Sequence, residues 1–280
     1  LSPMPSQNKP AAKRYPSELN ERQWKKLNAY LPPPKGGGRP ATDLRWVVNA
    51  ILYVVKSGCT WRMLPNDYPH WATVYGYFNA WSKSGLWLAI NADLVKRVRR
   101  RNKKKNGKRR KKRPSAAIID SQSVKATFGA GSERGYDAGK RIKGRKRFIL
   151  VDVLGLLLGV RVVAASVWEK EGAKGLLTYL SEHGVLKKVV RRVELVWADG
   201  GYQGPDLTEW VAQLWGWVWQ IVKRNDDQKG FVVLPKRWIV ERTFAWLTAN
   251  RRLVRDYEKD PKNSESMLYI AMLPIMLNRL

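Results

Sequence analysis

Apolar residues recur every three or four positions in the first third of the chain, which is the period of a helix with one buried face. Ser17 is a suitable cap for the first of these segments, and Pro32 ends it. Thr42 and Asp43 open the second segment, and Gly58 closes it. The pattern predicts four helices, over residues 17–31, 42–57, 71–83 and about 87–98.

After Pro114 the pattern changes to short, nearly continuous apolar runs, which are typical of buried strands. One such run ends at Asp120, another ends at Asp199, and a turn near Gly155 divides a third into two strands. The expected elements are strands over 115–120, 147–163 (a hairpin), 194–198 and 217–222, and helices over 171–183, 206–214 and 235–252. Their order predicts an α/β fold with a mixed sheet, as in an RNase H-like core.

The net charge indicates an acidic partner. Lys and Arg number 53 against 23 Asp and Glu, which gives a formal net charge of +30. Nucleic acid is the usual partner of such a chain. The basic residues are densest over 96–113, a run that is internal and joins two patterned regions. We expect this run to follow the DNA backbone, with a solvated localisation signal as the alternative. The candidate contacts in it are Arg99, Arg100, Arg101, Lys103, Lys104, Arg109 and Arg110.

These patterns predict four parts of the chain. Residues 1–14 are expected to form a flexible tail and residues 15–95 a small, all-α, helix-turn-helix-like DNA-binding domain, in which helix 71–83 enters the groove. The alternative for this region is a plain helical bundle whose aromatic residues all lie in the core. Residues 96–114 are predicted to be a basic linker, and residues 115–280 an RNase H-like catalytic domain.

Several classes of protein are excluded or disfavoured by composition. A single cysteine and two histidines exclude a disulfide framework and a zinc site built from Cys and His. They also give little support to Ser-His-Asp or Cys-His catalysis. No apolar run suits secretion or a membrane span, since the longest, 267–277, is short and contains Pro274. We therefore expect a cytoplasmic protein associated with the nucleoid, with no membrane partner and no small-molecule substrate.

Three carboxylates are candidates for metal-dependent chemistry. Asp120 and Asp199 are each placed at the end of an apolar strand, and Glu241 lies at the margin of the apolar stripe of helix 235–252. Carboxylates that converge repel one another unless divalent cations neutralise them. Singly, each aspartate is more often a turn or cap residue. Asp152 is a rival for either aspartate, and Asp137 is expected to lie in a loop.

Six segments of the chain resemble, in the same order, those of bacterial insertion-sequence transposases of the DDE type, and most nearly the family called insertion sequence five. The segments are SGCTWRMLP (57–65), IIDSQSVK (118–125), GYDAGKRIKGRKRFILVDVLGLLLGV (135–160), WADGGYQG (197–204), RWIVERTFAWL (237–247) and RRLVRDYE (251–258). Each segment alone is a weak signal, but together they are highly specific.

The resemblance implies that Asp120, Asp199 and Glu241 form a catalytic triad that holds two Mg²⁺ or Mn²⁺ ions. It implies cleavage of double-stranded DNA at the transposon ends and joining of those ends to target DNA, by a homodimer or larger assembly on paired ends. The candidate phosphate contacts near the triad are Lys125, Arg237, Arg242, Arg251 and Arg252.

Two other functions remain open from the sequence. A structure-selective RNase H-like nuclease would share the carboxylates but would not prefer the ends of an element. A DNA-binding regulator derived from a transposase would bind DNA without cutting it. The tryptophans of the segment 210–219 are candidates for stacking on a base, although we expect most of them to pack in the core.

Overall fold

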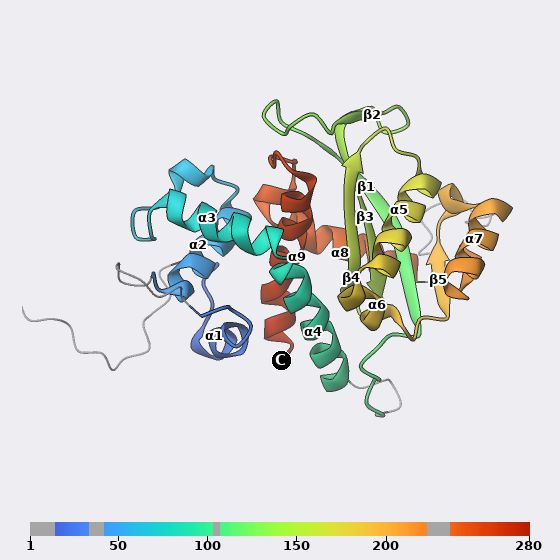
Figure 1. The fold of residues 1–280 in the computed structure, drawn as a ribbon, viewed down its shortest axis with the longest axis horizontal. Coiled ribbons are helices and arrows are strands. Elements are labelled where there is room, and N and C mark those ends of the chain that lie inside the picture. Colours follow the sequence, from blue (N-terminus) through green and yellow to red (C-terminus); the bar gives the residue numbers. More distant parts are fainter. Residues whose placement is uncertain (1–14, 34–41, 103–106, 223–235) are drawn as a thin grey trace, which may run out of the picture.

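The structure is a computed structural model that describes residues 15–33, 42–102, 107–222 and 236–280. A group of helices built from the first hundred residues lies on one side of the molecule, and a sheet with its own helices lies on the other (Figure 1). The last helix of the chain runs between the two. In the described ranges no helix is long and apolar enough to span a membrane.

The first region contains the four predicted helices. These are α1 (Glu21–Asn28), α2 (Leu44–Ser57), α3 (Trp71–Lys83) and α4 (Leu86–Arg101), with a 3-10 turn, η1 (Trp61–Met63), between α2 and α3. The predicted caps of α2 are confirmed, because the Asp43 side chain accepts from a backbone N–H and Gly58 has a φ of 75°. The predicted cap of α1 is wrong. Asn20, rather than Ser17, caps α1 through a capping box with Gln23.

The second region contains one mixed, six-stranded sheet, so the predicted α/β class is confirmed. Its strands are β1 (Ala116–Lys125), β2 (Gly135–Asp137), β3 (Ile142–Asp152), β4 (Leu157–Ala164), β5 (Leu195–Ala198) and β6 (Val218–Ile221). The strand order is β2-β3-β1-β5-β6, and β4 also pairs with β3. Strands β1, β5 and β6 are parallel, whereas β3 is antiparallel to each of its partners.

Two predictions for the strands are wrong. β1 does not end at Asp120 but continues to Lys125, because its polar second half pairs with β3. Asp137 lies in β2 rather than in a loop. Both errors arise because polar residues in a paired ribbon do not form an apolar run, although their backbone groups are satisfied by the neighbouring strand.

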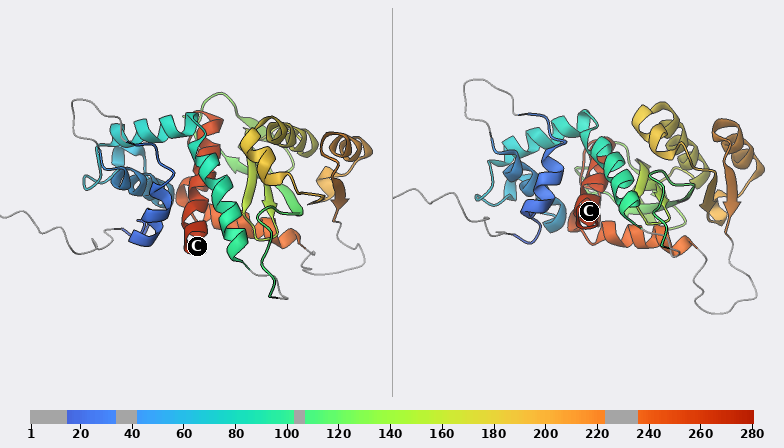
Figure 2. Two further views of the ribbon diagram at one scale, coloured as in Figure 1. Left: turned by 60° about the horizontal axis from the view of Figure 1, so that its bottom comes forward. Right: turned by 90° about the horizontal axis from the view of Figure 1, so that it is seen from below.

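Five helices accompany the sheet. They are α5 (Glu169–Glu182), α6 (Gly184–Val190), α7 (Pro205–Trp215), α8 (Arg237–Thr248) and α9 (Pro261–Asn278), with 3-10 turns η2 (Gly200–Tyr202) and η3 (Arg251–Leu253). Helices α5 and α6 cover one face of the sheet, and α8 lies along the opposite face (Figure 2). The helix predicted over 235–252 is shorter than expected, since α8 ends at Thr248.

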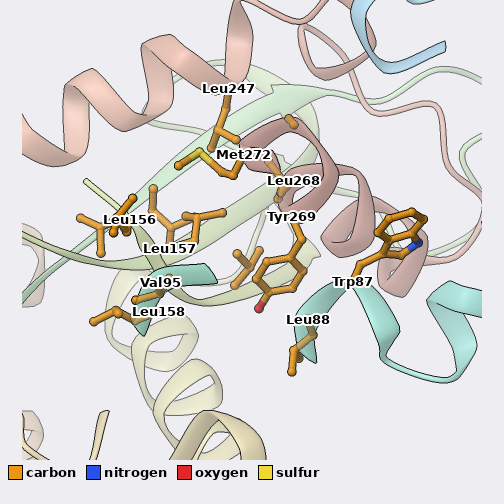
Figure 3. Packing of buried hydrophobic residues seen from close by; sticks show 14 of the residues in the cluster. Trp87, Leu88, Val95, Leu156, Leu157, Leu158, Leu247, Leu268, Tyr269 and Met272 are labelled. Atoms are coloured by element: carbon orange, nitrogen blue, oxygen red, sulfur yellow. The ribbon is translucent and has the colours of Figure 1, made fainter. Parts of the chain in front are cut away.

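Helix α9 was not predicted and joins the two regions. Thirteen of the 18 residues of α9 are buried, in an unbroken run from Asn263 to Leu273 and again at Met276 and Leu277. It packs against α2, α3 and α4 on one side and against β4 and α8 on the other. In Figure 3, Leu268, Tyr269 and Met272 of α9 lie between Trp87 of α4 and the residues that lead into β4. The helical region and the sheet therefore share one continuous hydrophobic core.

Buried ion pairs reinforce this junction. Arg99, near the end of α4, pairs with Asp152 at the end of β3, and both side chains are almost fully buried. Arg252 pairs with Glu258 at 2.7 Å and also donates to the backbone carbonyl of Cys59, in the turn after α2. These contacts join segments that are far apart in the sequence.

Candidate active site

Asp120 and Asp199 are neighbours across two parallel strands. Strand β1 pairs with β5 from Ala116 opposite Leu195 to Ile118 opposite Trp197, a constant offset of 79 residues. The same offset separates Asp120 from Asp199. Extending the register by two residues therefore puts the two aspartates next to one another. Residues opposite each other in a sheet project from the same face, and adjacent strands are about 4.8 Å apart. The two carboxylates therefore form a pair.

The face that carries this pair is the one covered by α8. Asp120 lies opposite Ile149 in β3, so their side chains project from the same face of the sheet. The next residue of β1, Ser121, projects from the other face. Arg147 of β3 shares the face of Ile149, and it donates to the carbonyl of Leu253, in the segment after α8. Asp120 therefore faces α8, and Ser121 faces α5.

Helix α8 adds a carboxylate and a cation to the pair. Glu241 is exposed on α8, and Arg237 lies one turn before it. The Arg237 guanidinium lies 3.5 Å from a Glu241 oxygen and 4.0 Å from an Asp199 oxygen, so it bridges the strand edge and the helix. These long, partly exposed contacts contribute little to stability. The three predicted carboxylates are thus gathered at one edge of the sheet, with Arg237 among them.

Local backbone groups fix the two aspartates. Asp120 accepts from the N–H of Ser121 at 2.7 Å, and Asp199 accepts from the N–H of Gly201 at 2.9 Å, which caps η2. The pKa of Asp120 is raised to about 6, mainly by burial and also by the neighbouring charge of Asp199, against the opposing influence of the Ser121 N–H and of Arg237. Two negative groups that share a partly buried site attract a cation.

The donor chemistry suits Mg²⁺ or Mn²⁺, because both prefer carboxylate oxygen. A cavity of about 10 Å³ lies between Asp120, Asp199 and Arg237, which is room for about one water molecule or small ion. Across the described ranges, however, no three Asp, Glu, His or Cys side chains are close enough to share one ion. Asp120 and Asp199 fit a divalent cation as a pair, whereas Glu241 lies too far from them to share that ion in this structure.

The predicted phosphate contacts divide by burial. The exposed ones are Lys125, Arg100, Arg101, Arg109 and Arg251, and Arg110 is half-buried. Arg99 and Arg252 are buried in the ion pairs of the junction, so their guanidinium groups face protein rather than solvent. Lys103 and Lys104 lie outside the described residues.

Arg242 of α8 is held between two tryptophan rings of the same helix. Its guanidinium lies 4.6 Å from the ring centres of both Trp238 and Trp246, one turn before and one turn after it. The Arg279 guanidinium also lies over the Trp246 ring, 4.9 Å from its centre, and both arginines donate to the carbonyl of Leu154. The spacing of four residues in Trp238, Arg242 and Trp246 is visible in the sequence and could have revealed this stack.

The structure also shows where Asp152 and the candidate stacking tryptophans lie. Asp152 is fully buried, accepts from the N–H groups of Leu154 and Leu156, and pairs with Arg99, so it closes the β3–β4 turn. Trp217 and Trp219 are buried in the core. A residue that the sequence did not single out is Lys236, whose ammonium lies 3.7 Å from the ring centre of Trp197 beside the carboxylate pair.

Comparisons with known proteins agree with this architecture. Residues 19–91 match the family described as "Putative transposase of IS4/5 family", and residues 111–276 match the family described as "Transposase DDE domain". The chain is also 27% identical over 124 residues to the "Insertion element IS402 uncharacterized 16.2 kDa protein" of Burkholderia cepacia, which covers 42% of this chain and 78% of that protein. Since the second family extends over more than half of the chain and over the whole sheet with its carboxylates, this protein belongs to the DDE transposase family.

Proposed function

We propose that this protein binds the terminal inverted repeats of its own insertion sequence, cuts the DNA at those ends and joins them to target DNA. The observation that carries the proposal is the register of β1 and β5, which puts Asp120 beside Asp199 on the face where α8 presents Glu241. A carboxylate pair on a rigid sheet and a third carboxylate on an adjoining helix are suited to phosphoryl transfer on DNA.

Asp120, Asp199 and Glu241 would hold the divalent cations. When bound, such cations activate the attacking oxygen and stabilise charge on the phosphate. In the first step a water oxygen bonds to phosphorus, the P–O3′ bond breaks and the element end keeps a free 3′-hydroxyl. In the second step that hydroxyl oxygen attacks a target phosphate, and a target 3′-hydroxyl leaves. Each step forms one P–O bond and breaks one.

Arg237 and the exposed basic side chains would handle the DNA. Arg237 neutralises Asp199 and Glu241 in the structure and would turn to a phosphate when a cation takes over that role. Lys125 ends the strand that carries Asp120, and Arg100, Arg101 and Arg109 are further exposed cations at and after the end of α4. Helix α3 would enter the groove, and a homodimer or larger assembly would hold two ends together.

The test is cleavage of a labelled duplex that carries the terminal repeat flanking this reading frame, in Mg²⁺ or Mn²⁺. We expect cutting at the repeat boundary by the wild type and by Glu209→Gln, an exposed carboxylate of α7. Glu241→Gln should bind the duplex and leave it intact. Binding without cutting by every protein would indicate a regulator, and cutting without preference for the repeat would indicate a nuclease. Cutting by Glu241→Gln would exclude Glu241 from the triad.

A further inference from the structure

A ribbon of strands extends from the sheet past the carboxylate pair. The pairing of β1 with β5 ends at Ile118, whereas the pairing of β1 with β3 continues to Lys125 opposite Gly144. Strand β2 then pairs with the first residues of β3, which forms a hairpin with its turn at residues 138–141. Figure 1 shows β2 and its flanking loops projecting from this end of the sheet.

The surface of this hairpin and of the loop before it, residues 126–134, is both aromatic and basic. Phe128 is 97% exposed and Tyr136 is 55% exposed, although most aromatic residues elsewhere are packed in or against the core. Exposing a phenylalanine so fully is unfavourable in water and suggests a partner. The basic side chains exposed on the same hairpin and on the strand beside it are Lys125, Lys140, Arg141 and Lys143. Arg141 and Lys143 make no side-chain hydrogen bond or ion pair with any residue that the structure describes.

A buried cluster anchors the hairpin. Asp137 of β2 accepts from the Ser123 hydroxyl at 2.5 Å and from the N–H of Lys140 at 3.0 Å. The Lys146 ammonium lies 3.5 Å from Asp137 and 3.0 Å from Glu169, and it is almost fully buried. Since these contacts reach from the hairpin to β1, β3 and α5, they hold the hairpin in one orientation on the sheet.

The same cluster places the hairpin next to the carboxylate pair. A Cβ atom on Gly201 would lie 3.2 Å from an Asp199 carboxylate oxygen and 3.4 Å from the Glu169 side chain, so Glu169 reaches from the anchor to the Asp199 loop. Whatever the hairpin binds is therefore close to the site of chemistry.

We propose that the β2–β3 hairpin, together with the loop that leads into it, is a DNA-binding clamp beside the active site. Lys140, Arg141 and Lys143 contact backbone phosphates, and Phe128 of the loop and Tyr136 of β2 stack on a base or sugar. Cations beside exposed aromatic rings are the combination that binds nucleic acid next to an active site. DNA rather than a second copy is the occupant that we assign to this surface, because its exposed cations are complementary to phosphates. This clamp rests on the proposed function and adds to that function the surface that aligns the DNA.

Two paired variants test the basic part of the clamp. Lys140→Ala/Arg141→Ala removes one lysine and one arginine from the hairpin turn. The control, Lys187→Ala/Arg191→Ala, removes one exposed lysine from α6 and one exposed arginine directly after it. Each is titrated with a duplex that carries the terminal repeat, at 50 to 200 mM salt. For the hairpin variant we expect weaker binding, with a salt slope smaller by about 0.9 for each phosphate that the protein no longer neutralises. The α6 variant should behave as the wild type. Equal slopes and affinities for both variants would overturn the clamp.

A second variant tests the aromatic part. Phe128→Ala/Tyr136→Ala should weaken binding of the same duplex by roughly tenfold without changing the salt slope, because stacking does not release counterions. The control is Leu214→Ala, an exposed apolar residue of α7, which should have no effect. Thermal unfolding of every variant should match the wild type, since these side chains are exposed.

The outcomes separate the clamp from the proposed function. Wild-type protein that binds the duplex but never cuts it would overturn the proposed function, while weaker binding by the hairpin variants would still support the clamp. Cutting by the wild type together with unchanged binding by the hairpin variants would overturn the clamp alone. If light scattering showed that the hairpin variants dissociate an oligomer and bind DNA normally, the partner would be a second copy, and the clamp would be overturned.

Discussion

Arginines pair with carboxylates both at the junction of the two regions and at the carboxylate edge of the sheet, but the pairs are buried at the junction and exposed at the edge. At the junction, Arg99 pairs with Asp152 and Arg252 with Glu258, and all four side chains are at most 8% exposed. At the edge, Arg237 approaches Asp199 and Glu241 only to 4.0 and 3.5 Å, and the three side chains are 27 to 55% exposed.

This difference separates structural from functional charges. In a buried ion pair with complete hydrogen bonds, no charged group is free to bind a ligand. Removing one partner leaves the other charge unpaired in a medium of low dielectric constant. A loose, exposed pair has little effect on stability and can exchange its partner for a metal ion or a phosphate. Substitutions at the junction should therefore unfold the protein, whereas substitutions at the edge should inactivate a folded one.

The largest effect on activity is expected at the edge, from Asp120→Asn. Replacing one carboxylate oxygen by an amide removes a charge that would hold a divalent cation, so we expect cleavage to slow by at least about a thousandfold, roughly 4 kcal/mol of barrier. Thermal stability should be unchanged or slightly higher, because burial already raises the pKa of Asp120. The measurement is single-turnover cleavage beside a thermal melt. A variant that loses activity only because it unfolds would contradict the comparison.

The largest effect on stability is expected at the junction, from Arg99→Ala. The substitution leaves Asp152 buried and without its cation, which typically costs about 3 to 5 kcal/mol. Urea unfolding monitored by tryptophan fluorescence measures this cost. The matched control is Arg100→Ala, which is exposed on the same helix and should change stability by less than about 0.5 kcal/mol. Equal free energies of unfolding for the two variants would show that the buried Arg99–Asp152 pair does not stabilise the fold.

Much of this organisation could be predicted from local sequence. Gly58 was identified as the end of α2 because a glycine after an apolar period marks a helix end, and its φ of 75° follows from that role. Asp199 was placed after a short strand for a similar local reason, and β5 ends at Ala198 as expected. The register that puts Asp120 beside Asp199 depends on a parallel pairing across 79 residues, which no local pattern contains.

The remaining differences have a common cause in tertiary structure. Helix α9 is apolar on all sides because two regions enclose it, so it lacks the one-sided period that predicts a helix, and Pro274 resembles a break. Arg99 and Arg252 looked like phosphate contacts because basic residues cluster around them. Their partners, Asp152 and Glu258, become neighbours only when the chain folds.

A smaller effect is expected from Arg237→Gln, which removes the cation at the edge. Two unit charges about 4 Å apart interact by about 1 kcal/mol in a water-like medium, which suits a guanidinium that is 35% exposed. We therefore expect the affinity for Mn²⁺ without DNA to rise roughly fivefold, measured by isothermal titration calorimetry. Arg251→Gln, an exposed arginine after α8, is the control. Unchanged or weaker Mn²⁺ binding would mean that Arg237 does not compete with the cation for these carboxylates.

A last test asks whether every charge at the junction is as well compensated as Arg99 and Arg252. Glu265 of α9 is buried, pairs with Arg161 at 3.0 Å and accepts from the N–H of Val162, yet burial raises its pKa to about 7. Below about pH 4.5 the folded and unfolded states both hold this proton. Between about pH 4.5 and 7 only the folded state holds it, so stability falls as pH rises through this window and levels off above it.

Glu265→Gln keeps an acceptor for the N–H of Val162 but cannot titrate, so the contribution of this side chain to the pH dependence should vanish. The slope that disappears is at most about 1.4 kcal/mol per pH unit, because one proton is involved. Urea unfolding at pH 5, 6, 7 and 8 measures it, with Glu182→Gln, an exposed carboxylate of α5, as the control. Parallel stability curves for the wild type and Glu265→Gln would show that Arg161 compensates this carboxylate fully, and the junction would then be uniform in its charge pairing.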